Sequence, residues 1–299
     1  MTLFLQLLVS GLSLGAVYAL LALGFVIVFK SSGVVNFAHP ALLMIGAYTI
    51  ARVSSATHLP FLFALLAGVG VAGVVALVVQ RLLVYPMAGR SLIAVSIMTI
   101  GVDVITQTEI IRRIGLDGYL PVRDPWGDGV VRIGGLVVPQ TRIAALIVGG
   151  VLILAFFVWL RYSRWGVAMR AVADDPETAA LMGVRRATVS ALAWTLAGVL
   201  AAIAGLFITV FPSPGLQPVT AAVALRAFPA AIIGGLDSTG GAIVGGLIVG
   251  VTESLVQGYA TELSFLGGGF HGVMPYVVML AVLLVRPSGL FGAKELHRV

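Results

Sequence analysis

The run LFLQLLVSGLSLGAVYALLALGFVIVF, Leu3 to Phe29, decides the fold class. It contains no charged side chain, and the first cation, Lys30, follows it. A helix needs about 20 apolar residues to cross roughly 30 Å of hydrocarbon, so this run is long enough to span a bilayer. It is too long for the apolar region of a signal peptide, and no basic segment precedes it. We therefore expect a retained first helix.

Further apolar runs follow with short polar breaks between them. With the first helix, eight membrane segments are expected, the others being Val34 to Ala51, Leu59 to Val84, Leu92 to Ile111, Ile143 to Leu160, Val189 to Phe211, Val219 to Leu236 and Gly240 to Gln257. Val273 to Val285 is a ninth candidate, and the count returns to eight if Val34 to Ala51 does not cross the membrane. The chain is 60% hydrophobic and 10% charged, with a mean hydropathy of +1.10, which does not describe a soluble protein. These data predict an all-α integral membrane protein, a single domain over residues 1–299 with about eight transmembrane helices.

The segment Val219 to Leu236 is unusual because it carries Arg226 and Pro229 at its centre. A charge and a missing backbone amide are both costly within a bilayer unless protein or a water-lined cavity surrounds them. We therefore expect a re-entrant or broken helix there. Arg226 should be buried against protein, near a carboxylate or near carbonyls freed around Pro229.

The cations indicate the orientation of the chain. We assume that the C-terminus is cytoplasmic and that the helices cross the membrane alternately. The following cations at helix ends then lie on the cytoplasmic side, as the excess of cations in cytoplasmic loops predicts: Lys30, Arg81, Arg90, Arg161, Arg164, Arg170, Arg185, Arg186, Arg286, Lys294 and Arg298. Residues 116–142 then form an extracytoplasmic segment, in which VVRIGGLVV predicts a small hairpin or loop. Residues 161–188 form a cytoplasmic segment.

The cytoplasmic segment contains a short predicted helix, Pro176 to Met182. Asp174 or Asp175 can cap its start, proline suits a first helical turn, and Gly183 can end it. Its side chains include two small residues next to two large apolar ones, in the order Ala179, Ala180, Leu181 and Met182. Such a surface fits a peg seated in a groove of a partner protein. An ordinary capped connector is the alternative.

A polar stripe marks the segment Leu92 to Ile111. Ser96, Thr99, Asp103 and Thr106 recur at spacings of three and four, which places them on one helix face. This face should line a path for water or solute, with a buried structural network as the alternative, because an intramembrane carboxylate is a functional candidate. Glu253 and Gln257 repeat this pattern on Gly240 to Gln257.

Two further polar residues, Asn36 and His39, precede Pro40 at the start of a membrane segment. They are candidates for the same path, although a lone histidine is often a structural, hydrogen-bonded residue. No second histidine or carboxylate stands at metal-ligand spacing nearby. Glycines four residues apart, such as Gly11 and Gly15, or Gly246 and Gly250, predict close helix packing within the subunit or, alternatively, a dimer contact.

Several function classes find no support. The net charge of +6 and the pI near 10.1 come from arginines at helix ends rather than from a basic run, so nucleic-acid binding is not expected. The chain has no cysteine, so it cannot form a disulfide or a thiolate metal site. No catalytic motif and no phosphate-binding loop occur, so this chain needs no cofactor, and any ATP and Mg²⁺ must be bound by another polypeptide.

Taken together, five motifs resemble the LivH-type permeases of branched-chain amino acid ABC transporters over almost the whole chain. They are GLSLGAVYALLALGFVIVF, VVNFAHPALLMIGAY, RYSRWGVAMRAVADDPETAALMGV, RAFPAAIIGGLDSTGGAIVGGLIVG and the closing RPSGLFG. The resemblance implies a multi-pass permease of the bacterial inner membrane. It also implies a second homologous permease, as homodimer or heterodimer, two ATP-binding subunits and an extracytoplasmic solute-binding protein.

The third motif resembles the coupling helix that such permeases insert into an ATPase subunit. The contact residues implied by the resemblance and by the helix pattern are Arg170, Asp175, Glu177, Ala179, Ala180, Leu181 and Gly183. The substrate-path candidates are Asn36, His39, Ser96, Thr99, Asp103 and Glu253.

The second motif departs from its relatives at one point. Relatives usually continue NFAH with glycine and glutamate, whereas this chain has Pro40 and Ala41. If that acidic residue reads a substrate ammonium group, its absence here keeps urea, short amides and carboxylates such as aromatic acids open as alternatives to the branched-chain amino acids that the resemblance implies. An ion-coupled secondary transporter is the alternative class, because broken helices and intramembrane carboxylates also occur there. An intramembrane enzyme is disfavoured, since no nucleophile and base stand out.

Overall fold

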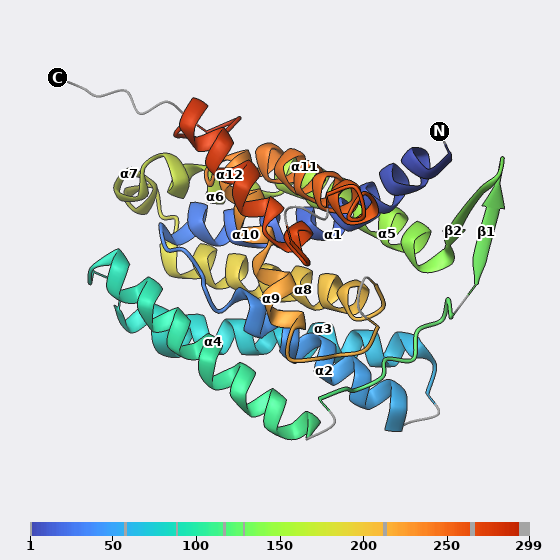
Figure 1. Ribbon diagram of the computed structural model, residues 1–299. Coiled ribbons are helices and arrows are strands. Elements are labelled where there is room, and N and C mark those ends of the chain that lie inside the picture. Colours follow the sequence, from blue (N-terminus) through green and yellow to red (C-terminus); the bar gives the residue numbers. More distant parts are fainter. Residues whose placement is uncertain are drawn as a thin grey trace.

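The computed structural model describes residues 2–56, 59–87, 89–115, 118–127, 129–211, 214–263 and 267–292. Lys294 and Arg298, and residues 116, 117 and 128 of the expected outer loop, lie outside these ranges. Figure 1 shows the elements, which are α1 (Thr2–Ser32), α2 (His39–Ala56), α3 (Phe61–Val79), the π-helix η1 (Gln80–Val84), the 3-10 helix η2 (Tyr85–Met87), α4 (Leu92–Ile114), β1 (Val130–Ile133), β2 (Leu136–Pro139), α5 (Gln140–Tyr162), α6 (Arg164–Asp174), α7 (Pro176–Leu181), α8 (Arg186–Ile208), α9 (Thr220–Leu225), α10 (Ala227–Gly234), α11 (Thr239–Gly258), η4 (Phe270–Gly272) and α12 (Met274–Val285).

Among the described residues, six helical stretches are long and apolar enough to cross a membrane: Thr2–Ser32, Phe61–Met87, Leu92–Ile114, Gln140–Tyr162, Arg186–Ile208 and Thr239–Gly258. Two shorter apolar stretches, Thr220–Gly234 and Met274–Val285, accompany them. The predicted all-α membrane fold with about eight spans is therefore confirmed. The segment expected from Val34 begins its helix only at His39, because residues 33–38 are irregular.

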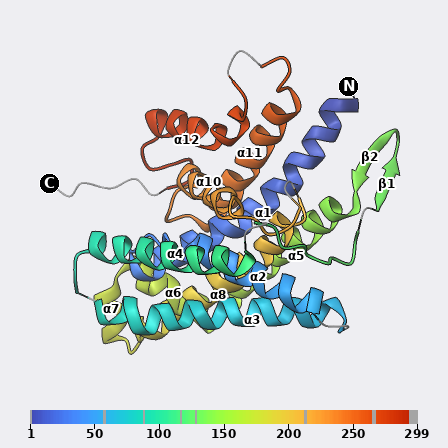
Figure 2. The ribbon, with the colours of Figure 1, turned by 60° about the horizontal axis from the view of Figure 1, so that its bottom comes forward.

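Helix α1 lies at the centre of the molecule, packed against α5, α8, α10 and α11 (Figures 1 and 2). Within its apolar stretch 89% of the residues are buried, compared with 17% in α4, which contacts the rest mainly through α2. The outward side chains of the peripheral helices are large and apolar, such as Leu66 of α3 and Ile105 of α4. Large apolar side chains on the outer surface are expected where lipid, rather than water, surrounds the protein.

Glycines allow α11 to pack closely on two neighbours. An added methyl group at Gly246 or Gly250 would overlap the backbone of α1, and one at Gly245 would overlap that of α10. Gly15 faces the α11 backbone in the same way. The predicted close packing within the subunit is thus confirmed, because small residues let helix backbones approach within a membrane.

The two ends of the molecule differ in structure. At one end, β1 and β2 pair antiparallel, with Val131 opposite Val138, and form the predicted hairpin; α7 lies at the other end (Figure 1). Trp126 of the loop stacks on Phe207 of α8, with ring centroids 5.5 Å apart. An element that the sequence did not predict is α6, which precedes α7.

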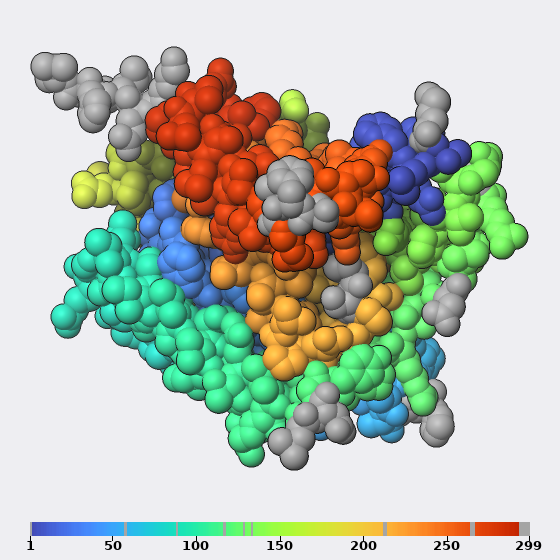
Figure 3. All heavy atoms as spheres, in the orientation of Figure 1, coloured from blue at the N-terminus to red at the C-terminus, as the bar shows by residue number. Residues whose placement is uncertain are grey.

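The segment Val219 to Leu236 is broken, as predicted, into α9 and α10. The break falls at Arg226, which separates the two short helices, and Pro229 lies inside α10. Figure 3 shows this segment, in orange, lying between α12 in red and α4 in teal.

Candidate functional site

Two polar sequence motifs, far apart in the chain, meet at the start of α2. The side-chain Oδ1 of Asn36 accepts a hydrogen bond from the Ala38 amide at 3.0 Å, a turn that leads the chain into α2. The next residue, Phe37, donates its backbone amide to Oγ1 of Thr99 on α4, at 3.0 Å. Thr99 is fully buried. The structure therefore brings the predicted residues Asn36 and Thr99 together.

The His39 ring is buried against α1. A methyl group at Gly24 would overlap the imidazole, so this position has room only for glycine. The ring of Phe25 lies 4.6 Å from that of His39, and Phe228 of α10 contacts both Phe25 and Phe37 at 5.4 and 5.5 Å between centroids. An aromatic cluster thus joins α1, α2 and α10 beside the polar segment.

Asp103 lies next to the first turn of α2. Its Oδ2 accepts a hydrogen bond of 2.6 Å from Gln107 one turn along α4. The Ala41 amide interacts with the carboxylate, and Oδ1 is buried with no hydrogen-bond partner recorded among the described residues. The positive end of α2 favours a negative charge at this place.

Unpartnered buried polar atoms gather around this segment. Within the described part of the chain, Asn36 Nδ2, both ring nitrogens of His39 and Asp103 Oδ1 make no hydrogen bond. Such atoms carry a desolvation cost that a polar ligand or water can relieve. Ser96 is only half-buried and donates to the Leu92 carbonyl of its own helix, so it lies on the stripe without joining this group.

The candidate Glu253 belongs to a second cluster. Its Oε1 accepts from Arg226 Nη1 in an ion pair, and its Oε2 accepts from the Tyr18 hydroxyl at 2.8 Å. Glu253 is 2% exposed. The expected carboxylate partner of Arg226 is thereby found. Sequence reasoning missed Tyr18 and Phe228; a tyrosine in the middle of an otherwise apolar helix was the available signal for the former.

Helix α7 is closed at both ends by local hydrogen bonds. Asp175 Oδ1 accepts from the amides of Glu177 and Thr178, at 3.0 and 3.1 Å. The amides of Gly183 and Val184 bond back to the carbonyls of Ala180 and Ala179, with Gly183 at a φ of +85°. This is the glycine-dependent end that the sequence predicted.

The hydrogen bonds of Asp175 also affect its titration. The Thr178 hydroxyl and the Thr178 amide, followed by the Glu177 amide, hold the pKa of the Asp175 carboxyl below its usual value of 3.8. The carboxylate is therefore ionised at neutral pH and remains an acceptor for the first turn of α7.

The two faces of α7 differ. Leu181 and Met182 are 87% and 81% exposed, and Ala180 and Glu177 are exposed with them. Ala179 is buried against the chain's own core, so it anchors α7 instead of facing outward. Arg170 donates to the Leu160 carbonyl at 2.7 Å, which ties α6 to the end of α5.

Among the described residues, no three histidine, aspartate or glutamate side chains gather as a metal site. The arrangement contains a buried polar segment, an aromatic cluster and an internal ion pair, with an exposed apolar peg at one end. It suits the recognition and movement of a small solute by a larger assembly.

Comparison with known proteins gives one family over most of the chain. A family described as "Branched-chain amino acid transport system / permease component" matches residues 7–285. The high-affinity branched-chain amino acid transport system permease protein LivH of Escherichia coli K12 is 30% identical over 99% of this chain and 98% of the relative. The permease protein BraD of Pseudomonas aeruginosa is 28% identical over the same shares. The solved structure of PsaBC from Streptococcus pneumoniae in complex with Fab covers 94% of this chain and 90% of that chain, at 16% identity and a TM-score of 0.47, which is too low to support an argument about the fold.

Proposed function

Because the chain belongs to the family of permease components of branched-chain amino acid transport systems, we propose that it moves an aliphatic amino acid past the segment 36–41 under the control of α7. As a member of this family it is a multi-pass membrane subunit, homologous to LivH of the bacterial inner membrane, and it is not itself catalytic. ATP is handled by partner subunits, and a binding protein delivers the solute. An ion-coupled secondary transporter does not fit this family.

The solute proposal rests on the neighbours of Ala41. At this position relatives usually carry glutamate, and here the carboxylate of Asp103 lies beside the Ala41 amide instead. The free Oδ1 of Asp103 is suited to accept from an ammonium group, while Phe37 and Phe228 offer an apolar surface for an aliphatic side chain. This combination favours an amino acid over urea or a carboxylate without an amine.

A second permease subunit, homologous to this one, is the partner we propose for the exposed side of α4. This helix carries a half-buried carboxylate, Asp103, in a stretch only 17% buried. A second subunit packed over α4 would close the outer side of the Asp103 site and keep its carboxylate away from lipid, where a charge costs a few kcal/mol. Two differently tagged copies, co-expressed, distinguish a homodimer from a heterodimer by whether they purify together.

The exposed end of α7 is the main support for its proposed contact with the ATPase subunit. Leu181 and Met182 project from a helix whose two ends are fixed by their own hydrogen bonds. Exposed apolar side chains on a rigid, otherwise polar segment are typical of a protein interface. Closure of the ATPase pair would push on α7, and α6 and α8 would pass the displacement to the core.

A cross-linking experiment tests this contact. The chain has no cysteine, so Leu181→Cys places a single thiol on α7. Leu62→Cys, at an exposed position of α3 near the opposite end, is the matched control. A bifunctional thiol reagent is expected to join Leu181→Cys, and not the control, to the ATPase subunit in the assembled transporter. Equal cross-linking of both variants, or none, would contradict the proposal.

A further inference from the structure

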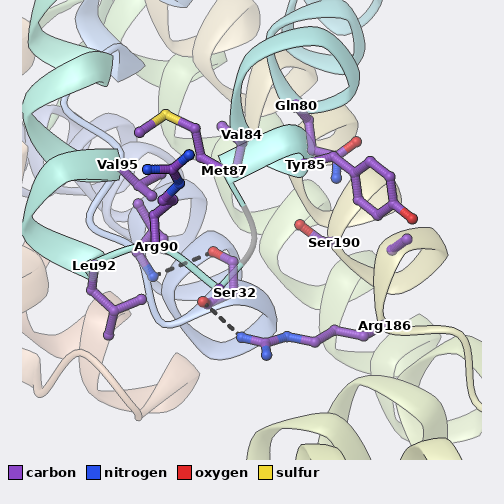
Figure 4. Close-up of a pocket in the computed structure, with 13 residues that line it drawn as sticks. Ser32, Gln80, Val84, Tyr85, Met87, Arg90, Leu92, Val95, Arg186 and Ser190 are labelled. Atoms are coloured by element: carbon purple, nitrogen blue, oxygen red, sulfur yellow. Dashed lines mark hydrogen bonds between the residues drawn. The ribbon is translucent and has the colours of Figure 1, made fainter.

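A cavity of about 430 Å³ opens where α1 ends, η1 and η2 follow α3, and α4 and α8 begin (Figure 4). The basic ends of several helices gather here, and α7 leads directly into α8. By the excess of cations in cytoplasmic loops, this is the cytoplasmic side of the membrane. None of the substrate-path or coupling candidates lines this cavity.

A buried amide whose oxygen has no hydrogen-bond partner lines the cavity. Gln80 is 1% exposed, and its Oε1 makes no hydrogen bond to any described residue. It begins the π-helix Gln80–Val84. Single π-turns within helices occur frequently at functional sites, and here the turn sets an amide at the cavity wall. An unsatisfied buried acceptor is an unoccupied position for a donor from a ligand.

Two arginines supply positive charge to the same cavity. Arg90 lines it from the connection before α4, and its guanidinium makes no hydrogen bond or ion pair within the described ranges. Arg186 lines it from the first residue of α8 and gives Nη2 to the Ser32 carbonyl at 3.0 Å, which leaves its other donors available. None of the described lining residues is acidic. The cavity therefore favours an anion.

The remaining walls are apolar and continue onto the lipid-facing surface. Val84, Leu92 and Val95 line the cavity. Next to them Leu82 and Ile93 point outward, 68% and 72% exposed. A basic cavity that opens onto an apolar outer surface fits an anion with attached hydrocarbon chains better than a free anion. The hydrocarbon chains would lie along Leu82 and Ile93, at the depth where lipid headgroups meet the bilayer core.

We propose that this cavity binds the headgroup of an anionic phospholipid of the cytoplasmic leaflet. The phosphate diester is held by Arg90 and Arg186, a headgroup hydroxyl donates to Gln80 Oε1, and the acyl chains lie against the outer faces of η1 and α4. The site is separate from the path and from α7, so it stands independently of the function proposed above.

The test is lipid retention by the complete transporter. Assembled complexes in nanodiscs of mixed phosphatidylglycerol and phosphatidylcholine are released into detergent, and native mass spectrometry counts the retained lipids. The wild type is expected to retain phosphatidylglycerol preferentially. Arg90→Gln should lower that retention about five- to tenfold, as expected for the loss of one charge-assisted contact. Arg90→Lys, which keeps the charge, should retain most of it.

Arg81→Gln is the matched control, because Arg81 lies exposed on the same π-helix without lining the cavity. Gln80→Met, which removes the acceptor at similar volume, should lower retention without altering the charge. Equal losses in Arg90→Gln and Arg81→Gln would overturn the proposal. So would displacement of the lipid by millimolar glycerol phosphate, which would indicate a soluble ligand, or the absence of any preference in the complex that includes the ATPase subunits.

Discussion

Arg226 and Glu253 form an ion pair that ties the break between α9 and α10 to the middle of α11. Tyr18 of α1 completes the group through its hydrogen bond to Glu253. Three separate segments are thereby fixed to one another inside the membrane domain. The ion pair compensates the charge of Arg226, so the broken segment of α9 and α10 can lie inside the protein.

Removing one charge of this pair should destabilise the protein strongly. Glu253→Gln leaves the Arg226 guanidinium mostly buried without its counter-charge, which costs about 3 kcal/mol. Thermal unfolding of the purified protein in detergent measures the effect. Glu262→Gln, at an exposed position, is the control. Equal unfolding temperatures for the two variants would show that the ion pair contributes little.

The hydrogen bond between Phe37 and Thr99 should hold the start of α2 against α4. Thr99→Val keeps the shape of the side chain but leaves the Phe37 amide without an acceptor, at a cost of about 1 kcal/mol. Thr99→Ser should restore it. Thr106→Val alters the same stripe without removing a hydrogen bond that the structure records, and it should have little effect on unfolding. A similar loss in Thr106→Val would contradict this assignment.

Asp103→Asn should impair transport without impairing assembly. The asparagine can still accept from Gln107 but carries no charge for an ammonium group. Reconstituted uptake of leucine is expected to fall about tenfold, because a charge-assisted hydrogen bond is lost. Preference for leucine over its amine-free carboxylate analogue should fall with it. Glu109→Gln, on the exposed end of α4, is the control. Normal selectivity in Asp103→Asn would remove the proposed role.

The cap of α7 has a defined pH dependence. Because hydrogen bonds lower the pKa of Asp175 below 3.8, its stabilising effect is present above that value and is lost only as the pH falls through the lowered pKa. At neutral pH, hydrogen exchange at the Glu177 and Thr178 amides should be faster in Asp175→Ala than in the wild type. Asp175→Asn should stay close to the wild type, since asparagine also caps helices. Equal protection in all three would contradict the capping role.

The features that follow from local chemistry could be predicted from the sequence. The caps of α7, the break at Arg226 and the hairpin each depend on residues close together in the chain. Arg226 also required a partner, and Glu253, a carboxylate inside a membrane segment, proved to be that partner.

The contacts between distant segments could not be read from periodicity. Nothing local indicates that Phe37 bonds to Thr99, that the ring of His39 fills the space beside Gly24, or that Ala179 faces inward while Ala180 faces outward. The cavity at Gln80 was likewise missed, because five different elements build it. Side-chain packing between helices determines these details.

The coupling role of α7 is tested most directly by Ala180→Glu in the assembled transporter. This substitution places a charge on the exposed face beside Leu181, where burial against a partner costs on the order of a few kcal/mol. Ala56→Glu, exposed at the end of α2 on the opposite side, is the control. We predict that Ala180→Glu inserts into the membrane normally but loses ATPase co-purification and solute-stimulated ATP hydrolysis. Wild-type values for both in Ala180→Glu would contradict the account.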